Sequence, residues 1–243
     1  KISVSSAGTA TITAVQAETG EFAENRISAD LTIAGESIVT VDTGERHNCG
    51  VTEAGGVVCW GSNVYGQLGD NTRTNRAYPV SVSGLSTGVT KIATGMWHSC
   101  AVLSDGTVKC WGRNTWGQLG NNSRNDSNVP VAVSGITNAV DIATSGYASC
   151  AVLSTGGVKC WGYGGYGELG YGSNTDSNVP VVLPKLTYGV TSIDASEFNY
   201  CVTLDKGTVK CWGRNDWYNI GDGTNTNRNE PTEVIGLDSG ASR

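Results

Sequence analysis

The chain has little of what marks several common protein classes. Its 243 residues include 1 Met, 2 Phe, 2 His and 5 Pro, and 16% of them are charged. Because 22 acidic residues outnumber 16 basic ones, the formal net charge is −6, and there is no positive field to attract nucleic acid. No apolar run approaches the ~20 residues that a membrane-spanning helix needs. We therefore expect neither binding to nucleic acid nor insertion into a membrane.

Cysteine and glycine are the residues that the chain uses freely, and the cysteines recur in register. Eight cysteines form four pairs, and the second member of every pair is followed by Trp-Gly. The pairs are Cys49 with Cys59, Cys100 with Cys110, Cys150 with Cys160, and Cys201 with Cys211. Since the pairs recur about every 50 residues, the chain is predicted to be an array of repeated supersecondary units.

The segment between paired cysteines is predicted to be a β-hairpin with a three-residue turn. In the second repeat it runs from Cys100 to Cys110 around Ser-Asp-Gly. A glycine holds the last turn position in all four repeats, at Gly55, Gly106, Gly156 and Gly207. Glycine adopts the positive φ that a G1-bulge turn requires there. Counted outward from this turn, the two cysteines face each other at a Cα separation of ~4.5 Å, which a disulfide accepts. Four intra-hairpin disulfides are predicted.

Two other uses of the cysteines must be weighed. Zinc sites favour short Cys-x-x-Cys spacings with histidines near by, whereas His47 and His98 hold matching positions in two separate repeats. Free buried thiols suit a cytosolic protein, but eight cysteines in register favour an oxidising compartment. We therefore expect structural disulfides, no metal and no cofactor.

The rest of each repeat predicts short strands separated by turns. After Trp-Gly come an aromatic position, a Leu-Gly or Ile-Gly, and a loop rich in Asn, Asp, Ser and Thr. A proline (Pro79, Pro130, Pro180 or Pro231), a Val-rich run, a glycine-containing turn and a strand such as residues 89–93 follow. About four short strands per unit, without helical periodicity, predict an all-β chain. Four-stranded antiparallel units repeated radially form a β-propeller.

Residues 92–120 closely resemble the repeat of the regulator of chromosome condensation family, and the resemblance extends over roughly residues 38–237. It implies a seven-bladed propeller, of which four repeats are visible. The paired cysteines look like those of the family's secreted bacterial members. No insertion resembles the wedge hairpin with which the nuclear member acts on its small GTPase, so nucleotide exchange is not carried over. The family's Gly and His before the hairpin are Gly44 with His47 and Gly95 with His98 in repeats one and two, but Ser145 with Ala148 and Ser196 with Asn199 in repeats three and four.

The two ends of the chain differ from the repeats. Residues 1–36 hold alternating strands without cysteine or tryptophan, and they resemble the C-terminal part of a bacterial immunoglobulin-like domain. Residues 37–243 are assigned to the propeller, and the segment from Pro231 is expected to open a fifth blade. Four repeats cover only part of a seven-bladed ring, so open β-edges are expected at both ends. We expect further blades of a longer chain, or neighbouring subunits in an assembly such as a surface filament, to cover them.

Candidate catalytic and metal-binding residues are scarce. The two histidines are interpreted as structural, and no nucleophile–base pair stands out, although a site built across blades stays open. The loops at residues 70–75 and 222–227 carry Asp, Asn and Thr, which suit either calcium or Asx-turns. Because these loops lack the carboxylate density of a dedicated calcium site, Asx-turns are the preferred interpretation. The chain is not expected to be an enzyme.

The aromatic residues give a better functional prediction. The tryptophans after the cysteines (Trp60, Trp111, Trp161, Trp212) and the next aromatic position (Tyr65, Trp116, Tyr166, Trp217) belong to the repeated motif and are interpreted as packing. The residue three before each first cysteine instead varies within a fixed frame: Arg46, Trp97, Tyr147 and Phe198. Trp, Tyr and Arg are common hot-spot residues, and a β-lactamase inhibitory member of the family holds its partner with the loops at this end of the blades. These four residues form the candidate binding face, and the alternative is that they fill gaps between blades.

The sequence thus favours a non-catalytic, extracellular binding or assembly module of a bacterial surface or appendage protein. Its expected partner is a protein, and homo-assembly is one form that this interaction could take. The alternative function is a secreted proteinaceous inhibitor of an enzyme, as in the β-lactamase inhibitory propeller. The immunoglobulin-like lead-in argues against an inhibitor, because a freely diffusing inhibitor needs no stalk.

Overall fold

The computed structural model describes residues 8–15, 26–33 and 37–237. The chain divides into two compact units, Lys1–Ser37 and Ile38–Arg243. In the described residues no helix has the length and apolar character needed to cross a membrane.

The described residues of the first unit form one pair of antiparallel strands. β1 (Gly8–Val15) pairs with β2 (Arg26–Ile33), and Gly8 lies opposite Ile33. Residues 1–7, 16–25 and 34–36 lie outside the described part of the chain. The assignment of residues 1–36 to an immunoglobulin-like domain therefore stays a prediction.

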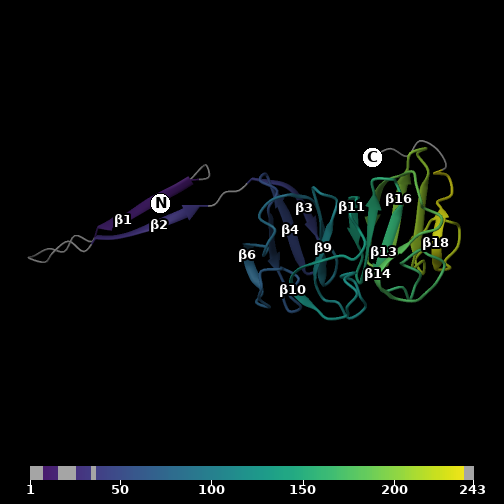
Figure 1. Ribbon diagram of the computed structural model, residues 1–243, viewed down its shortest axis with the longest axis horizontal. Helices are drawn as coiled ribbons and strands as arrows, with labels where there is room; N and C mark the ends of the chain where they lie inside the picture. The colour runs from purple at the N-terminus through teal and green to yellow at the C-terminus, as the bar shows by residue number, and fades with distance from the viewer. Residues whose placement is uncertain (1–7, 16–25, 34–36, 238–243) are drawn as a thin grey trace, which may run out of the picture. The chain divides into compact units, whose positions relative to one another are not determined.

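The second unit consists of four antiparallel sheets, here called blades 1 to 4, each made of four strands that are consecutive in the chain (Figure 1). Blade 1 contains β3 (Ile38–Thr43), β4 (His47–Thr52), β5 (Val57–Gly61) and β6 (Arg76–Ser81). Blade 2 contains β7 (Val89–Thr94), β8 (His98–Leu103), β9 (Val108–Gly112) and β10 (Ser127–Ala132). Blade 3 contains β11 (Ala139–Thr144), β12 (Ala148–Leu153), β13 (Val158–Gly162) and β14 (Ser177–Val182). Blade 4 contains β15 (Val190–Ala195), β16 (Asn199–Leu204), β17 (Val209–Gly213) and β18 (Arg228–Glu233).

Each blade has its disulfide hairpin at the centre. In blade 2, Cys100 on β8 lies opposite Cys110 on β9, and the bonded pair has a Cα–Cα distance of 4.1 Å. Gly106 closes the turn at φ 77°, the left-handed conformation that the sequence pattern requires. In the chain-entropy account, closing a loop this short is worth roughly 2–3 kcal/mol per bridge.

The other three blades form the equivalent bridge, and each bridge again joins the second strand of its blade to the third. These bridges connect Cys49 with Cys59, Cys150 with Cys160, and Cys201 with Cys211. Within the described residues no cysteine is free. The structure therefore forms all four disulfides that the spacing predicts, each within its own hairpin.

The outer strands contain the four repeated prolines, which is compatible with their position because proline cannot donate to a strand ladder. Pro130 lies in β10, where the register against β9 shifts between Ser127 and Val131. Pro231 holds the same place in β18, and Thr232 of this strand lies opposite Cys211 of β17. The expectation that this segment opens a fifth blade is therefore wrong. Its hydrogen-bond partners lie upstream, and β18 completes blade 4.

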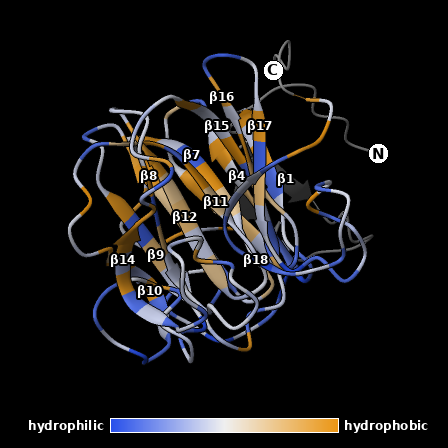
Figure 2. Ribbon diagram, turned by 90° about the vertical axis from the view of Figure 1, so that its right-hand side faces the viewer, coloured by the Kyte–Doolittle hydropathy of each residue, from blue (hydrophilic) through white to orange (hydrophobic). Residues whose placement is uncertain are grey.

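The hydrophobic cores lie between neighbouring blades. One cluster joins Leu68 and Leu85 of blade 1 to Trp111 of blade 2, and the next two clusters repeat this pattern around Trp161 and Trp212. These three tryptophans are 0% exposed. Figure 2 shows apolar residues along strands such as β7, β8 and β11, and hydrophilic residues in many of the loops. Truncating one such tryptophan to alanine is expected to cost about 3–5 kcal/mol.

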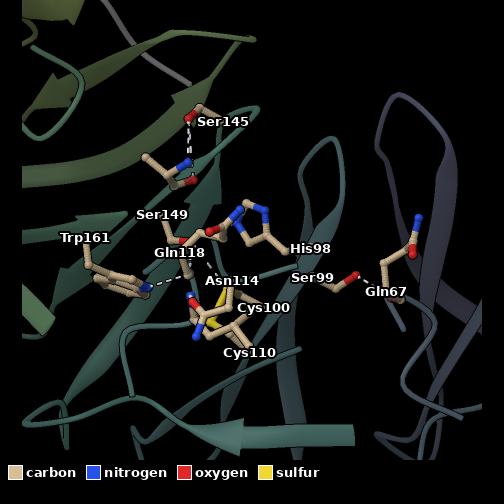
Figure 3. Close-up of a disulfide and its surroundings, with 12 residues drawn as sticks. Gln67, His98, Ser99, Cys100, Cys110, Asn114, Gln118, Ser145, Ser149 and Trp161 are labelled. Carbon is tan, nitrogen blue, oxygen red and sulfur yellow. Dashed lines mark hydrogen bonds between the residues drawn. A yellow bond between two sulfur atoms is a disulfide. The ribbon is translucent and has the colours of Figure 1, made fainter. Parts of the chain in front are cut away.

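A hydrogen-bond pattern ties blade 2 to blade 3 (Figure 3). The backbone carbonyl of Gln118 accepts bonds from Ser149 Oγ at 3.0 Å and from Trp161 Nε1 at 2.9 Å. Because the Ser149 hydroxyl proton is used in this bond, His98 donates from Nε2 to Ser149 Oγ, at 2.9 Å. The joint between blades 1 and 2 has the same pattern, formed by Gln67, His47, Ser99 and Trp111.

Both histidines are structural members of these joints. Burial lowers the pKa of His47 to about 4. Burial, and secondarily the proximity of His47, lowers the pKa of His98 to about 3. The two imidazoles are therefore neutral at physiological pH, which suits their place in an apolar joint.

The joint between blades 3 and 4 uses a different pair of side chains. Ala148 stands where the other joints have histidine, and Tyr200 stands where they have serine. The ring of Tyr200 stacks on Trp212 at a centroid distance of 5.7 Å, and its hydroxyl accepts a bond from Ser145 N at 3.1 Å. The large histidine and small serine of the other joints are thus replaced by a small alanine and a large tyrosine, so the joint stays filled.

The outer faces of blades 1 and 4 have no neighbouring blade within the described residues. Trp60 is the blade 1 counterpart of the buried tryptophans, but it is only half-buried, and Val39 on β3 is 63% exposed. On blade 4, Trp217 is 81% exposed and Ile235 is 72% exposed. Apolar side chains are thus exposed at both ends of the described arc, where a blade face has no neighbouring blade among the described residues.

Candidate functional site

The four candidate binding residues lie at one end of the blades, each immediately before the second strand of its blade. The preceding turn is tight, because Gly95 N donates to His98 O at 2.9 Å and the other three blades form the equivalent bond. This turn leaves the intervening side chains free of the ladder. Arg46 is exposed, and Trp97, Tyr147 and Phe198 are half-buried.

A second variable position lies beside the first. The carbonyl of Trp97 accepts a bond from Arg113 N at 2.9 Å, which connects the β7–β8 turn to the β9–β10 loop of the same blade. In the other blades the equivalent residues are Ser62, Tyr163 and Arg214. The bond joins backbone atoms only, so the side chain at this position can vary.

A third position is the aromatic residue a few positions later in the same loop. Tyr65 N donates to the side-chain oxygen of buried Gln67 at 2.9 Å. The ring of Tyr65 packs on Trp97 of the next blade at 5.2 Å, and Tyr166 packs on Phe198 at 5.4 Å. The sequence interpretation assigned this position to packing. In blades 1 to 3 these side chains do contact the next blade, but they remain half-buried at the loop end.

Together the three positions form a continuous surface, which we call the aromatic belt. Its members contact one another ring to ring or cation to ring; Arg46 Cζ, for example, lies 4.7 Å from the centroid of Trp97, and Arg214 Cζ lies 5.1 Å from that of Tyr166. All four predicted binding residues are members. Three other members, Tyr65, Trp116 and Tyr166, had been assigned to packing. Arg113, Tyr163 and Arg214 were missed, although the Ser, Arg, Tyr, Arg variation at their position is the same signal that identified the first. The belt consists of Arg46, Tyr65, Trp97, Arg113, Trp116, Tyr147, Tyr163, Tyr166, Phe198 and Arg214.

Two hollows are present at this end of the blades. The first, about 440 Å³, is lined by the tight turns of all four blades, including Glu45 and Glu197. In the described part of the chain no group of three or more His, Cys, Asp or Glu could hold a metal ion. The second hollow, about 290 Å³, is lined by belt residues only: Arg113, Trp116, Tyr147, Tyr163, Tyr166 and Phe198. Its aromatic walls suit an apolar group.

One buried acid lies directly behind the belt. Glu168 is 1% exposed, its Oε2 accepts a bond from Tyr166 N at 2.8 Å, and its Oε1 has no partner among the described residues. Burial raises the pKa of Glu168 to about 7, although its bonds to backbone N–H groups oppose this shift. Blades 1 and 2 have the neutral Gln67 and Gln118 at this position. Blade 3 therefore carries a group that ionises near neutral pH.

The Asp-containing loops are built as Asx-turns. The carboxylate of Asp70 accepts bonds from Thr72 N at 3.0 Å and from Arg76 Nε at 2.8 Å. Burial opposes ionisation of Asp70, but hydrogen bonds from Thr72, Arg76 and Asn63 outweigh it and lower the pKa. Asp222 has the equivalent partners, Thr224 and Arg228. Arginine already neutralises both carboxylates, which favours the Asx-turn interpretation over calcium.

The repeat that builds this face matches a known family. The family model for the "Regulator of chromosome condensation (RCC1) repeat" matches residues 54–102 and 105–152. A second model of the same repeat matches residues 38–67, 89–118, 139–168 and 190–216. The chain belongs to the RCC1 repeat family. This confirms the resemblance inferred from residues 92–120.

Two relatives are similar to this chain over part of their length. Probable E3 ubiquitin-protein ligase HERC4 from Homo sapiens is 38% identical over 95 residues, which is 38% of this chain and 9% of that protein. The X-linked retinitis pigmentosa GTPase regulator homolog from Caenorhabditis elegans is 37% identical over 95 residues, which is 38% of this chain and 7% of that protein. The chain thus spans less than a tenth of the length of these two relatives.

Solved structures share the RCC1 propeller fold. Human WBSCR16 has a TM-score of 0.74 at 25% identity, over 90% of this chain and 58% of that one. Prp20p from Saccharomyces cerevisiae has a TM-score of 0.73 at 22% identity, over 85% of this chain and 52% of that one. The predicted all-β propeller is confirmed.

Proposed function

We propose that this RCC1-repeat chain is a non-catalytic, extracellular protein-binding module of a bacterial surface or appendage protein, and that the aromatic belt holds its partner. One observation carries the proposal. Two neighbouring loop positions differ between repeats while the surrounding frame repeats, and both lie beside a repeated aromatic position at the same end of the blades.

The chemistry of the belt supports a protein as partner. Trp, Tyr and Arg are the residue types that most often dominate binding energy at interfaces, because they combine a large contact area with a polar group. Most belt side chains are half-buried, so their rotamers are already restricted before a partner arrives, which lowers the entropy cost of binding. Among the relatives, Prp20p is described as binding Gsp1p and histones and, as yeast RCC1, as bound to Kap60.

The disulfides support the extracellular part of the proposal. Four bridges involving all eight cysteines suit an oxidising compartment, because cytosolic reductants keep most thiols reduced. The resemblance of residues 1–36 to a bacterial immunoglobulin-like domain supports a position on a bacterial surface or appendage. A second copy of the chain counts among the protein partners.

A site-specific crosslinker tests the belt as the contact surface. A photo-reactive phenylalanine analogue is placed at Tyr147, in the belt, or at Tyr188, which is 77% exposed in the loop between β14 and β15 at the opposite end of the blades. The protein carrying either group is added to live cells and culture fluid of the source organism. We expect a discrete protein adduct from position 147 and none from position 188.

The captured protein is then purified, and its affinity is measured for the unaltered chain and for Trp97→Ala. We expect a loss of about 2 kcal/mol or more, which is roughly thirtyfold in Kd, with thermal unfolding still cooperative. Equal adducts at both positions, or unchanged affinity of a folded Trp97→Ala, would contradict the proposal. A secreted enzyme as the captured protein would favour the inhibitor function over surface assembly.

A further inference from the structure

The three arginines of the aromatic belt differ in how their charge is neutralised. Arg46 Nη2 lies 3.4 Å from Glu45 Oε1, and Arg214 Nε lies 2.6 Å from Asp216 Oδ2. Within the described residues, Arg113 has no carboxylate at salt-bridge distance. Its side chain forms one hydrogen bond, from Nε to Thr115 Oγ1 at 3.2 Å. The chain has a net charge of −6, so an arginine without an acidic neighbour is an exception that calls for an explanation.

The aromatic belt holds the Arg113 guanidinium in place. Its central carbon lies 4.9 Å from the ring centroid of Tyr65 and 5.8 Å from that of Tyr147. These contacts restrict the planar group, while Nη1 and Nη2 have no hydrogen-bond acceptor among the described residues. A planar guanidinium with free N–H groups matches a carboxylate, which it can bind through two parallel hydrogen bonds.

Arg113 also forms part of the wall of the 290 Å³ hollow. The other walls are the rings of Trp116, Tyr147, Tyr163, Tyr166 and Phe198. This volume is at or below the roughly 300–1,000 Å³ that is typical of small-molecule sites. The hollow suits a single apolar side chain that projects from a larger molecule. Because Arg113 is in its wall, the guanidinium can contact the residue next to that side chain.

We propose that Arg113 receives a carboxylate of the protein partner, and that an aromatic or aliphatic side chain next to this carboxylate fills the adjacent hollow. The partner segment therefore contains Asp or Glu beside a large apolar residue. This inference rests on the proposed function of the belt and adds the chemistry of the segment that it recognises. Charge complementarity favours an acidic segment at this position, since Arg113 is the belt cation that has no carboxylate at salt-bridge distance among the described residues.

Selection from a phage-displayed library of random peptides tests this specificity without knowledge of the natural partner. The immobilised bait is the intact chain, and peptides that bind it are sequenced and synthesised. We expect enriched peptides to share Asp or Glu within two positions of Trp, Tyr, Phe, Leu or Ile. Arg113→Gln should weaken their binding roughly tenfold to a hundredfold, because a charge-assisted hydrogen bond is lost.

The matched control for charge is Lys206→Gln, an exposed residue in the turn between β16 and β17 at the opposite end of the blades. It removes one positive charge and should leave the affinity unchanged. Replacing the acidic residue of the peptide by its amide should weaken binding to the unaltered chain as much as Arg113→Gln does. Combining both changes should cause little further loss, which is the signature of a direct pair.

The outcomes separate this inference from the proposed function. Two results would overturn the role of Arg113 and leave the belt as a binding surface. In the first, the enriched peptides bind the Tyr147→Ala variant more weakly but contain no acidic residue. In the second, they bind the Arg113→Gln variant as tightly as the unaltered chain. If no enriched peptide responds to Tyr147→Ala, Trp97→Ala or Arg113→Gln, both proposals are wrong. Thermal unfolding of each variant confirms that the blades remain folded.

Discussion

Replacing Glu168 by glutamine should change how the stability of the propeller depends on pH. Glutamine is the residue that blades 1 and 2 have at this position, as Gln67 and Gln118, and each of these accepts the same bond from a backbone N–H through its side-chain oxygen. The substitution therefore keeps the shape of the site and the bond from Tyr166 N. It removes only the carboxyl group that ionises.

The size of the effect follows from the pKa. Burial raises the pKa of Glu168 from 4.5 to about 7 in the folded chain. Below the unfolded-state pKa both states are protonated, so the folded state incurs no penalty. As pH rises from 4.5 to about 7, the unfolded chain ionises while the folded chain retains its proton, and stability falls by about 1.4 kcal/mol per unit. The unaltered chain should therefore lose about 3 kcal/mol relative to Glu168→Gln across this range.

Urea unfolding of the disulfide-bonded protein, followed by tryptophan fluorescence between about pH 4.5 and about pH 8, measures the difference. The two proteins should be similar near the lower limit, and Glu168→Gln should be more stable once the folded-state pKa of about 7 is passed. Gln118→Glu in blade 2 should introduce a second dependence of the same sign, whereas Glu53→Gln, in the exposed β4–β5 turn, should have no effect. Parallel stability curves for Glu168→Gln and the unaltered chain would refute the reasoning.

Three further predictions concern residues that lie at the joints between blades or at positions equivalent to them. Ser149→Tyr should destabilise the chain by about 1–3 kcal/mol through overpacking, and His98→Ala should cost about as much through loss of the shared hydrogen bond. Together the two changes reproduce the tyrosine–alanine pair of the next joint. In a double-mutant cycle the pair should therefore recover at least ~1 kcal/mol of the summed cost. Gly117→Ala should cost at least about 2 kcal/mol, because Gly117 has φ 84° and a Cβ there would lie 2.5 Å from Asn178 Cα of the next blade. Tyr218, the blade 4 counterpart, has φ 62° and no following blade within the described residues, so Tyr218→Gly should be neutral or stabilising by up to about 1 kcal/mol in the same urea assay. A harmless Gly117→Ala, or fully additive effects at positions 98 and 149, would contradict these accounts.

The parts of the fold that local rules determine could be predicted from the sequence. The glycine of the three-residue turn requires positive φ, this turn sets the hairpin register, and the register places Cys100 opposite Cys110. The same steps place Cys59 opposite Cys49 in blade 1 and Cys160 opposite Cys150 in blade 3. Each step depends on residues within the same hairpin, so one sequence was sufficient. The repeat period then gave the number of blades in the described arc.

The features that were missed depend on contacts between distant residues. The alternating sequence pattern of Pro231 and its neighbours is the same whether β18 pairs with β17 or with a later strand. The choice between the two depends on which strand has an unpaired edge next to β18, and this is a contact between segments. The raised pKa of Glu168 results from burial by the following blade, whose Trp212 Nε1 donates to the Glu168 carbonyl at 2.7 Å. The exchange of histidine and serine for Ala148 and Tyr200 is visible in the sequence, but only the joint reveals that the two changes compensate each other.

The aromatic belt combines two roles that the structure keeps on separate atoms. The fold uses the backbone of the belt residues: the Trp97 carbonyl accepts from Arg113 N, and Tyr65 N is held by the side chain of Gln67. These bonds do not depend on the side chains of the belt residues, so serine at position 62 forms the same backbone bond as Arg113. The side chains are then available for contact with a partner. A change at a belt position should therefore alter which partner is bound while leaving the blades intact, whereas a change at Gln67 should disturb the blades before it alters recognition.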